Sequence, residues 1–270
     1  MERVLLGLRL GDPPKAVEDR ASTLSAPEAF GARMLAMSKR QSVRFGTLEK
    51  GLGYGAWAFS LKRREFSLFF EVFKLLKRKR RAKTKKSAIV RLTKKVRQEF
   101  EAAAALSAAL EHSLDFKPAE DVTAVDASTE GWAVVTKSSG RGFMIDTGLE
   151  EPPAAVQNFL CSPTWRLRKT RRFRKRLDHI LPGEICAARQ GIIAHAKREP
   201  GCDLTILTDN SNVYYALRKG RSSSFRLNEL CRIVLAVEVI QQVRIHIRWV
   251  PTKMMPADVY TRERLLGEQL

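Results

Sequence analysis

The chain has 270 residues, 44% of them hydrophobic and 29% charged, and Lys and Arg outnumber Asp and Glu by 49 to 29. This length and apolar content suffice for a sizeable buried core, which excludes an intrinsically disordered chain. The formal net charge of +20 favours a polyanionic partner, above all nucleic acid.

The sequence also argues against a membrane or secreted protein. No apolar run is long enough to span a bilayer, and the start of the sequence lacks the small-residue cleavage site of a secretory signal. The four cysteines show no CxxC pair, so neither a zinc site nor a disulfide framework is predicted. We therefore expect an intracellular protein, in the nucleus or cytoplasm.

Residues 1–118 are predicted to form a basic, mostly helical region. Apolar residues recur at helical spacing over 27–37, 48–61, 66–81 and 88–114. The basic run KRKRRAKTKK, at 77–86, interrupts this pattern and is a solvated face, a nuclear import signal or a nucleic-acid contact. The charge of the whole chain favours the contact. Its expected nucleic-acid-binding residues are Lys77, Arg78, Lys79, Arg80 and Arg81.

Residues 119–270 are predicted to form an α/β domain, because short β-branched runs alternate with helical patterns. Strands are expected at 122–126, 132–137, 142–146, 204–208 and 243–249. Helices are expected over 182–197, from Asn210 to Gly220, and over 227–241. Trp132, Trp249, Tyr214 and Tyr215 are expected to build the core.

A second basic run, WRLRKTRRFRKR at 165–176, precedes the first of these helices. Like the first run, it is either a solvated segment or a nucleic-acid contact, and its interleaved aromatic residues could stack on bases or anchor the segment. The nucleic-acid-binding residues expected here are Arg168, Lys169, Arg171, Arg172 and Arg174.

Four acidic residues fall at ends of predicted strands or starts of predicted helices: Asp126, Glu184, Asp209 and Asp258. Each has an ordinary explanation, since acids at such places serve turns, cap helices or complement helix N-termini. Together they suggest a metal site. Phosphodiester hydrolysis can use two divalent ions about 4 Å apart, and clustered carboxylates are suitable ligands for Mg²⁺.

The order and context of these acids resemble the ribonuclease H domain of retroelement reverse transcriptases. The matching segments are VDASTEGWAVV, HILPGEICAA, LTDNSNVYYAL and RWVPTKMMPADVYTRE. The resemblance implies a ribonuclease H-like five-stranded mixed sheet, its first three strands antiparallel, flanked by helices. It also implies that Asp126, Glu184, Asp209 and Asp258 are the catalytic ligands of two Mg²⁺ ions, with Mn²⁺ as an alternative. The final segment departs from the family, with Met254 and Met255 before its Ala-Asp and Thr261 in place of a serine.

Upstream, LLGLRLGDPPKAVEDR resembles the end of the palm and the approach to the thumb of a reverse transcriptase. The segments FGTLEKGLGYGAWAF and VRLTKKVRQEFEAAAALSAAL resemble the helical thumb and connection of retrotransposons carrying a tyrosine recombinase, or of related elements. We therefore expect an endonuclease that cuts the RNA strand of an RNA/DNA hybrid, associated with the polymerase portion of its element or with a ribonucleoprotein complex. Asn210 and Ser211 are expected to contact sugar hydroxyls of the substrate. The alternative is a non-catalytic nucleic-acid-binding protein of a ribonucleoprotein assembly.

Overall fold

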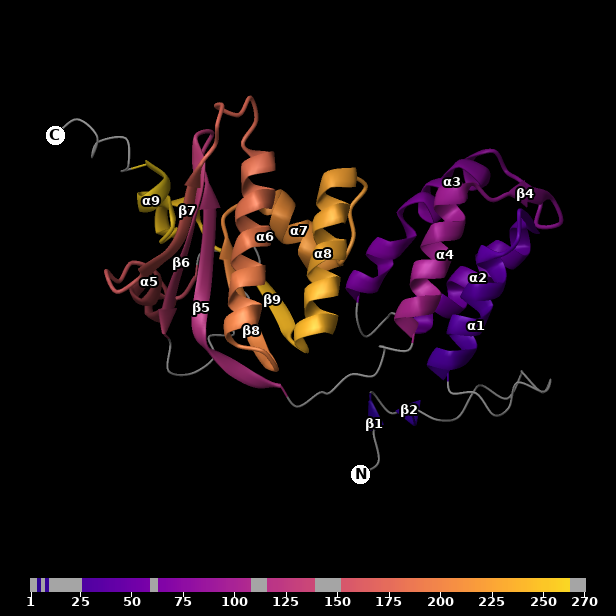
Figure 1. Ribbon diagram of the computed structural model, residues 1–270, viewed down its shortest axis with the longest axis horizontal. Helices are drawn as coiled ribbons and strands as arrows, with labels where there is room; N and C mark the ends of the chain where they lie inside the picture. Colours follow the sequence, from indigo (N-terminus) through magenta and orange to yellow (C-terminus); the bar gives the residue numbers. More distant parts are fainter. Residues whose placement is uncertain are drawn as a thin grey trace. The chain divides into compact units, whose positions relative to one another are not determined.

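The computed structural model describes residues 4–5, 8–9, 26–58, 63–107, 116–138 and 152–262. The chain divides into two compact units, Met1–His112 and Ser113–Leu270. They are the N-terminal and C-terminal units below, and each is described by itself (Figure 1). No helix among the described residues is long and apolar enough to cross a membrane.

The N-terminal unit is a small helical body. Its helices are α1 (Ala26–Ser38), α2 (Phe45–Ala58), the 3-10 helix η1 (Arg63–Phe69), α3 (Phe70–Arg81) and α4 (Lys94–Ser107). Two short antiparallel strand pairs accompany them: β1 (Val4–Leu5) with β2 (Leu8–Arg9), and β3 (Ser42–Arg44) with β4 (Ile89–Arg91). Met34, Leu48, Phe69 and Phe100 are fully buried in its core. Two acidic residues are buried with this core, Glu65 and Glu99, and the Glu99 carboxylate accepts hydrogen bonds from the backbone N–H groups of Glu71 and Val72.

The single helix expected over 88–114 is wrong at its start. Ile89 and Val90 pair with β3, and the helix begins only at Lys94. Thr93 caps this helix, because its Oγ1 accepts a hydrogen bond from the Val96 N–H at 3.3 Å. Helical periodicity gives no signal of this strand pairing, because Val43, the partner of Val90, lies 47 residues earlier in the chain. Residues 108–114 lie outside the described residues.

The first basic run spans the end of a helix, as predicted. Arg78, Lys79, Arg80 and Arg81 form the last turn of α3, and residues 82–86 follow it outside any helix. Lys and Arg are good helix formers, and cations near a helix C-terminus complement the helix dipole. Part of the charge clustering in this run is therefore explained by local helix energetics.

The C-terminal unit is built on a five-stranded mixed sheet with the order β7-β6-β5-β8-β9. The strands are β5 (Lys117–Ala127), β6 (Gly131–Ser138), β7 (Arg166–Arg172), β8 (Cys202–Thr208) and β9 (Arg244–Trp249). β5, β6 and β7 are antiparallel, whereas β8 and β9 run parallel to β5. The expected fold class, an α/β domain with a five-stranded mixed sheet flanked by helices, is confirmed.

Helices cover both faces of this sheet (Figure 1). On one face lie α6 (Leu181–Arg198), α7 (Ser211–Lys219) and α8 (Phe225–Gln241), and on the other α5 (Ala154–Leu160), the 3-10 helix η2 (Thr252–Met254) and α9 (Asp258–Arg262). Gly191 lets α6 approach β5 closely, since a Cβ there would lie 2.3 Å from Val125 Cγ1. This close packing brings the N-terminal turn of α6 to the end of β5.

The third antiparallel strand comes from an unexpected segment. The strand predicted at 142–146 lies outside the described residues, and the strand that pairs with β6 is β7, formed by the second basic run. Its side chains are exposed except for the partly buried Thr170. The run was expected to be a loop or a charged face, and it is an edge strand.

Candidate metal centre at the strand ends

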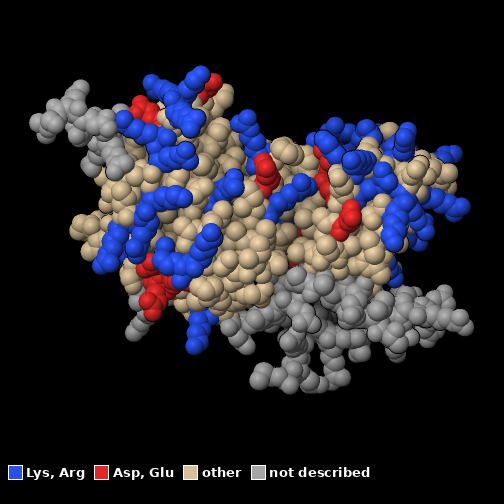
Figure 2. Space-filling model, in the orientation of Figure 1, with Lys and Arg blue, Asp and Glu red and all other residues tan. Residues whose placement is uncertain are grey.

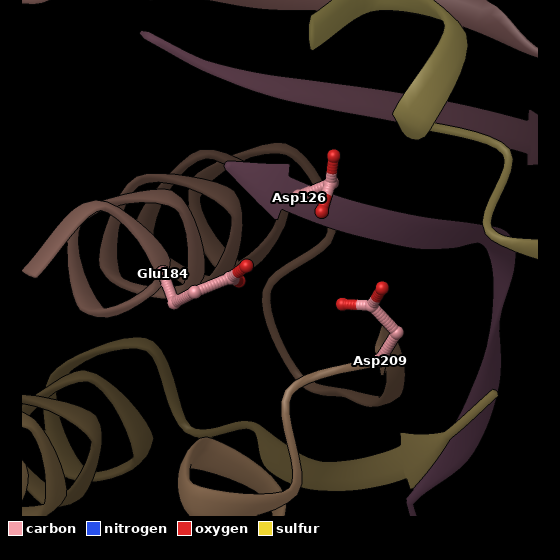
Figure 3. Close-up of side chains that lie close together, drawn as sticks. All are labelled: Asp126, Glu184 and Asp209. Atoms are coloured by element: carbon pink, nitrogen blue, oxygen red, sulfur yellow. The ribbon is translucent and has the colours of Figure 1, made fainter. Parts of the chain in front are cut away.

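Three of the four acidic residues come together from three separate elements (Figure 3). Asp126 lies at the end of β5, Asp209 directly follows β8, and Glu184 lies in the first turn of α6. β5 and β8 are paired in parallel with Ala124 opposite Leu207, so Asp126 and Asp209 occupy matching positions further along the two strands. One carboxylate oxygen from each residue lies within 4.8 Å of the others.

Asn210, and not Asp209, caps the helix that follows. Asn210 Oδ1 accepts hydrogen bonds from the backbone N–H groups of Asn212 at 3.1 Å and Val213 at 3.2 Å. The cap explanation of Asp209 therefore fails. The backbone of Asp209 is held instead by Trp249 of β9, whose Nε1 donates to the Asp209 carbonyl oxygen at 2.8 Å.

Asp258 joins the site from α9 without entering the three-residue cluster. It lines the same cavity as Asp126, Glu184 and Asp209, a hollow of about 360 Å³. Thr261, three residues later on the same helix, donates a hydrogen bond from its Oγ1 to Asp126 Oδ2 at 2.6 Å. From the sequence, Thr261 was only a departure from the family pattern, and its contact with Asp126 was not predicted. The spacing of three residues between Asp258 and Thr261 on a short helix is a usable signal that both side chains lie on one face.

The three clustered carboxylates are costly to ionise together. Burial raises the pKa of Glu184 to about 9, and the negative charges of Asp126 and Asp209 add to the effect. Burial likewise raises the pKa of Asp126 to about 7, while the hydrogen bond from Thr261 lowers it and the charges of Asp209 and Asp258 raise it. A bound cation would favour the ionised form of both carboxylates and lower their pKa values. Its positive charge would offset the repulsion between the carboxylates and replace the solvation that burial removes.

The donor set fits a hard divalent cation. Glu184 and Asp126 are each only 3% exposed, and Glu184 Oε2 is buried with no hydrogen-bond partner among the described residues. A buried carboxylate oxygen without a donor is unfavourable unless something else binds it. Mg²⁺ prefers oxygen ligands and keeps several waters, and the open cavity leaves room for them.

The expected nucleic-acid-binding residues fall in three places. Lys77 to Arg81 lie on α3 of the N-terminal unit, where Arg80 Nε is 2.9 Å from Glu49 Oε1. Arg168, Lys169, Arg171 and Arg172 lie on β7 at the sheet edge, and the exposed Arg174 follows them. Asn210 lines the carboxylate cavity, and Ser211 is exposed at the start of α7. Contact of any of these residues with nucleic acid stays a prediction.

Comparison with known proteins finds weak structural likenesses. No family model matches the chain, and no curated protein matches it. A foamy viral protease-reverse transcriptase in complex with an RNA/DNA hybrid matches with a TM-score of 0.30 and 12% identity, covering 83% of this chain and 27% of that chain. The dRH form of the same protein with double-stranded DNA matches with a TM-score of 0.26 and 12% identity, covering 81% of this chain and 34% of that chain.

The chain thus spans 27% and 34% of the lengths of these two matched chains. Both are foamy viral reverse transcriptases, whereas the sequence resemblance points to retrotransposons carrying a tyrosine recombinase, so the type of element stays a prediction. The strand order and the convergence of Asp126, Glu184 and Asp209 are features of this chain itself and do not depend on these matches.

Proposed function

We propose that this protein is a metal-dependent endonuclease that hydrolyses the RNA strand of RNA/DNA hybrids, as part or remnant of a retroelement reverse transcriptase. The observation that carries the proposal is the convergence of Asp126, Glu184 and Asp209 within 4.8 Å, in a cavity that Asp258 also lines. Structural acids on a protein surface have no need to share one partly enclosed site, and the burial of two of them is unfavourable without a cation.

In this proposal the four carboxylates hold two Mg²⁺ ions, with Mn²⁺ as an alternative. When bound, such ions lower the pKa of a water to make a nucleophile and stabilise the leaving oxygen, giving a 3′-hydroxyl and a 5′-phosphate as the family does. Asp126 and Glu184 must lose their protons to act as ligands, so binding of the ions and deprotonation are coupled. Thr261 orients the carboxylate of Asp126 through its hydrogen bond.

Charge supports a polyanionic substrate. The net charge of +20 would attract a nucleic-acid duplex, and the helical N-terminal region, resembling a thumb and connection, would grip it. Asn210 lines the cavity and the exposed Ser211 follows it in the chain, so contacts of these residues with the 2′-hydroxyl of RNA would distinguish the two strands.

The test is cleavage of a labelled RNA/DNA hybrid by the purified chain with Mg²⁺ or with chelator. Asp209→Asn should abolish cleavage, because it removes a ligand charge while keeping the shape of the side chain. Glu229→Gln, which changes an exposed acid on α8, should cleave like the wild type. Cleavage of the RNA strand that needs the metal and is lost in Asp209→Asn supports the proposal.

The competing candidate is a non-catalytic nucleic-acid-binding protein, favoured by the same net charge. It predicts that the wild type and Asp209→Asn bind the hybrid equally and that neither cuts it under any metal condition. That outcome would overturn the proposed nuclease function.

A further inference from the structure

The basic strand β7 presents different residues to the two sides of the sheet. Arg171 pairs with Trp132 and Lys169 pairs with Val134 on β6. Paired residues of neighbouring strands face the same side, and Trp132 and Val134 belong to the core under α6. Lys169 and Arg171 therefore face the side of the sheet that α6 covers.

An irregularity in β7 adds a third cation to this side. The register shifts between Val134 and Val135, so that Arg168 has no partner on β6. The bulge turns Arg168 toward α6, since its Nε donates to Thr136 Oγ1 at 2.6 Å and its guanidinium lies 3.6 Å from Asp121 Oδ2. Arg198 of α6 reaches the same Asp121 oxygen at 3.2 Å. This acid thus neutralises part of the charge at one end of the strand.

The flank of α6 completes a cationic strip beside β7. Lys169 Nζ donates to Gln190 Oε1 of α6 at 2.7 Å and lies 5.6 Å from the centre of the Trp132 ring, so its stem is held in place. Arg189 precedes Gln190 on α6 and is exposed. Burial raises the pKa of the nearby Cys186 thiol, and the charges of Arg189, Arg171 and Lys169 lower it, so all three cations act on the same group. In Figure 2, Lys and Arg side chains gather over this part of the C-terminal unit.

The cations of this strip, Lys169, Arg171 and Arg189, lack an acidic partner in the part of the chain that the structure describes. Asp121 pairs with Arg168 and Arg198, and Lys169, Arg171 and Arg189 make no ion pair with a described carboxylate. All three are exposed. Three like charges held near one another and without a counter-charge repel unless an external anion neutralises them.

Lys169, Arg171 and Arg189 are not among the residues that line the carboxylate cavity. Asp126 pairs with Ala133, the neighbour of Trp132, so Asp126 and Arg171 point to opposite sides of the sheet. Arg172 pairs with Gly131 and faces the side of Asp126. The pleat therefore divides the cations of one basic strand between the sheet face that α6 covers and the opposite face, toward which Asp126 points.

We propose that Lys169 and Arg171 of β7 and Arg189 of α6 bind the sugar-phosphate backbone of a nucleic acid at a contact separate from the carboxylate cavity. Lys169 and Arg171 are alternate residues of a strand, about 6.8 Å apart, a spacing that suits successive phosphates. An edge strand can also pair with a second copy of the chain, but two copies of this strand would bring like charges together. The inference extends the proposed function, and its test does not require cleavage.

The experiment measures the affinity of the full chain for a hybrid duplex at several salt concentrations in chelator. It compares the wild type with a triple variant that combines Lys169→Gln, Arg171→Gln and Arg189→Gln. The matched control, Lys197→Gln, Lys219→Gln and Arg226→Gln, removes the same charge from exposed positions on α6, α7 and α8.

Each phosphate contact contributes about 0.9 to the slope of log affinity against log salt. Between about 50 and 200 mM salt, the affinity of the wild type should therefore fall about 40-fold more than the affinity of a variant that has lost three contacts. The control should keep nearly the wild-type slope.

Lys169 packs on Trp132, so the triple variant could unfold, and thermal melting checks this. If it does unfold, Arg171→Gln with Arg189→Gln, compared with Lys197→Gln and Lys219→Gln, gives the same test with two contacts. Equal slopes for test and control variants overturn the proposal, and so does a wild type that binds no duplex. A change in self-association with duplex binding intact also overturns it, because the strip would then be a contact between copies of the chain.

Discussion

Replacing Asp126 with asparagine should stabilise the metal-free protein above neutral pH, although it removes a proposed metal ligand. Burial raises the pKa of Asp126 from 3.8 to about 7. The folded protein therefore holds this proton more tightly than the unfolded chain does. Asparagine has nearly the same shape, never ionises, and can still accept the hydrogen bond from Thr261 through its Oδ1.

The size of the effect follows from the pKa. One pKa unit corresponds to about 1.4 kcal/mol, so the change from 3.8 to about 7 corresponds to about 4 kcal/mol of unfolding free energy. Below pH 3.8 Asp126 is protonated in both the folded and the unfolded protein, so its ionisation does not reduce the unfolding free energy of the wild type. As the pH rises from 3.8 to about 7 the unfolded chain releases the proton first, and the wild type loses stability relative to Asp126→Asn throughout that window.

The assay is urea unfolding of both proteins in chelator at several pH values, followed by the same measurements with Mg²⁺. Asp126→Asn should gain up to about 4 kcal/mol over the wild type by about pH 8 and lose this advantage at about pH 4. Mg²⁺ at about 100 times its dissociation constant should stabilise the wild type by about 2.7 kcal/mol and the variant much less. A stability difference that does not vary with pH, or a variant less stable than the wild type at about pH 8, would refute the electrostatic reasoning.

Two further predictions concern packing and the hydrogen bond to Asp126. Gly191→Ala should destabilise the C-terminal unit by about 1–3 kcal/mol in urea unfolding, because its Cβ would lie 2.3 Å from Val125 Cγ1 and overpacking outweighs the helix propensity of about 1 kcal/mol that alanine adds. Gly53→Ala, with nothing within 4 Å of the new Cβ, should stabilise instead, and equal effects at the two glycines would contradict the packing argument. Thr261→Val should weaken Mn²⁺ binding measured by calorimetry, and Thr261→Ser should restore it, because only the hydroxyl donates to Asp126; a serine variant as weak as the valine variant would count against this role.

The sequence by itself determined most elements of the C-terminal unit, since their signals are local. Alternation of apolar residues predicted β9 and helical spacing predicted α8. The end of α7 was fixed by Gly220, which adopts φ 72° as a left-handed C-cap. Alternating strand and helix patterns predicted the α/β class, the resemblance implied a five-stranded mixed sheet, and the observed sheet confirms both.

Local chemistry could not decide between residues of similar propensity. Asp209 and Asn210 are both good N-cap residues, and only the path of the chain after β8 made Asn210 the cap. Tyr215 was expected in the core beside Tyr214, yet it is 40% exposed while Tyr214 is fully buried. Adjacent residues of a helix point about 100° apart, and in α7 Val213 and Tyr214 occupy the side that faces the core, so Tyr215 turns toward solvent.

The tertiary structure alone decided what depends on partners distant in the chain. The basic run became β7 because β6 offered an edge to pair with, although its side chains carry no alternating apolar signal. The same pairing register determines which of its cations share a side with Asp126 and which share a side with α6. Convergence of Asp126, Glu184 and Asp209 likewise arises from strand pairing and from the close approach of α6 to β5, which are long-range contacts that no local pattern encodes.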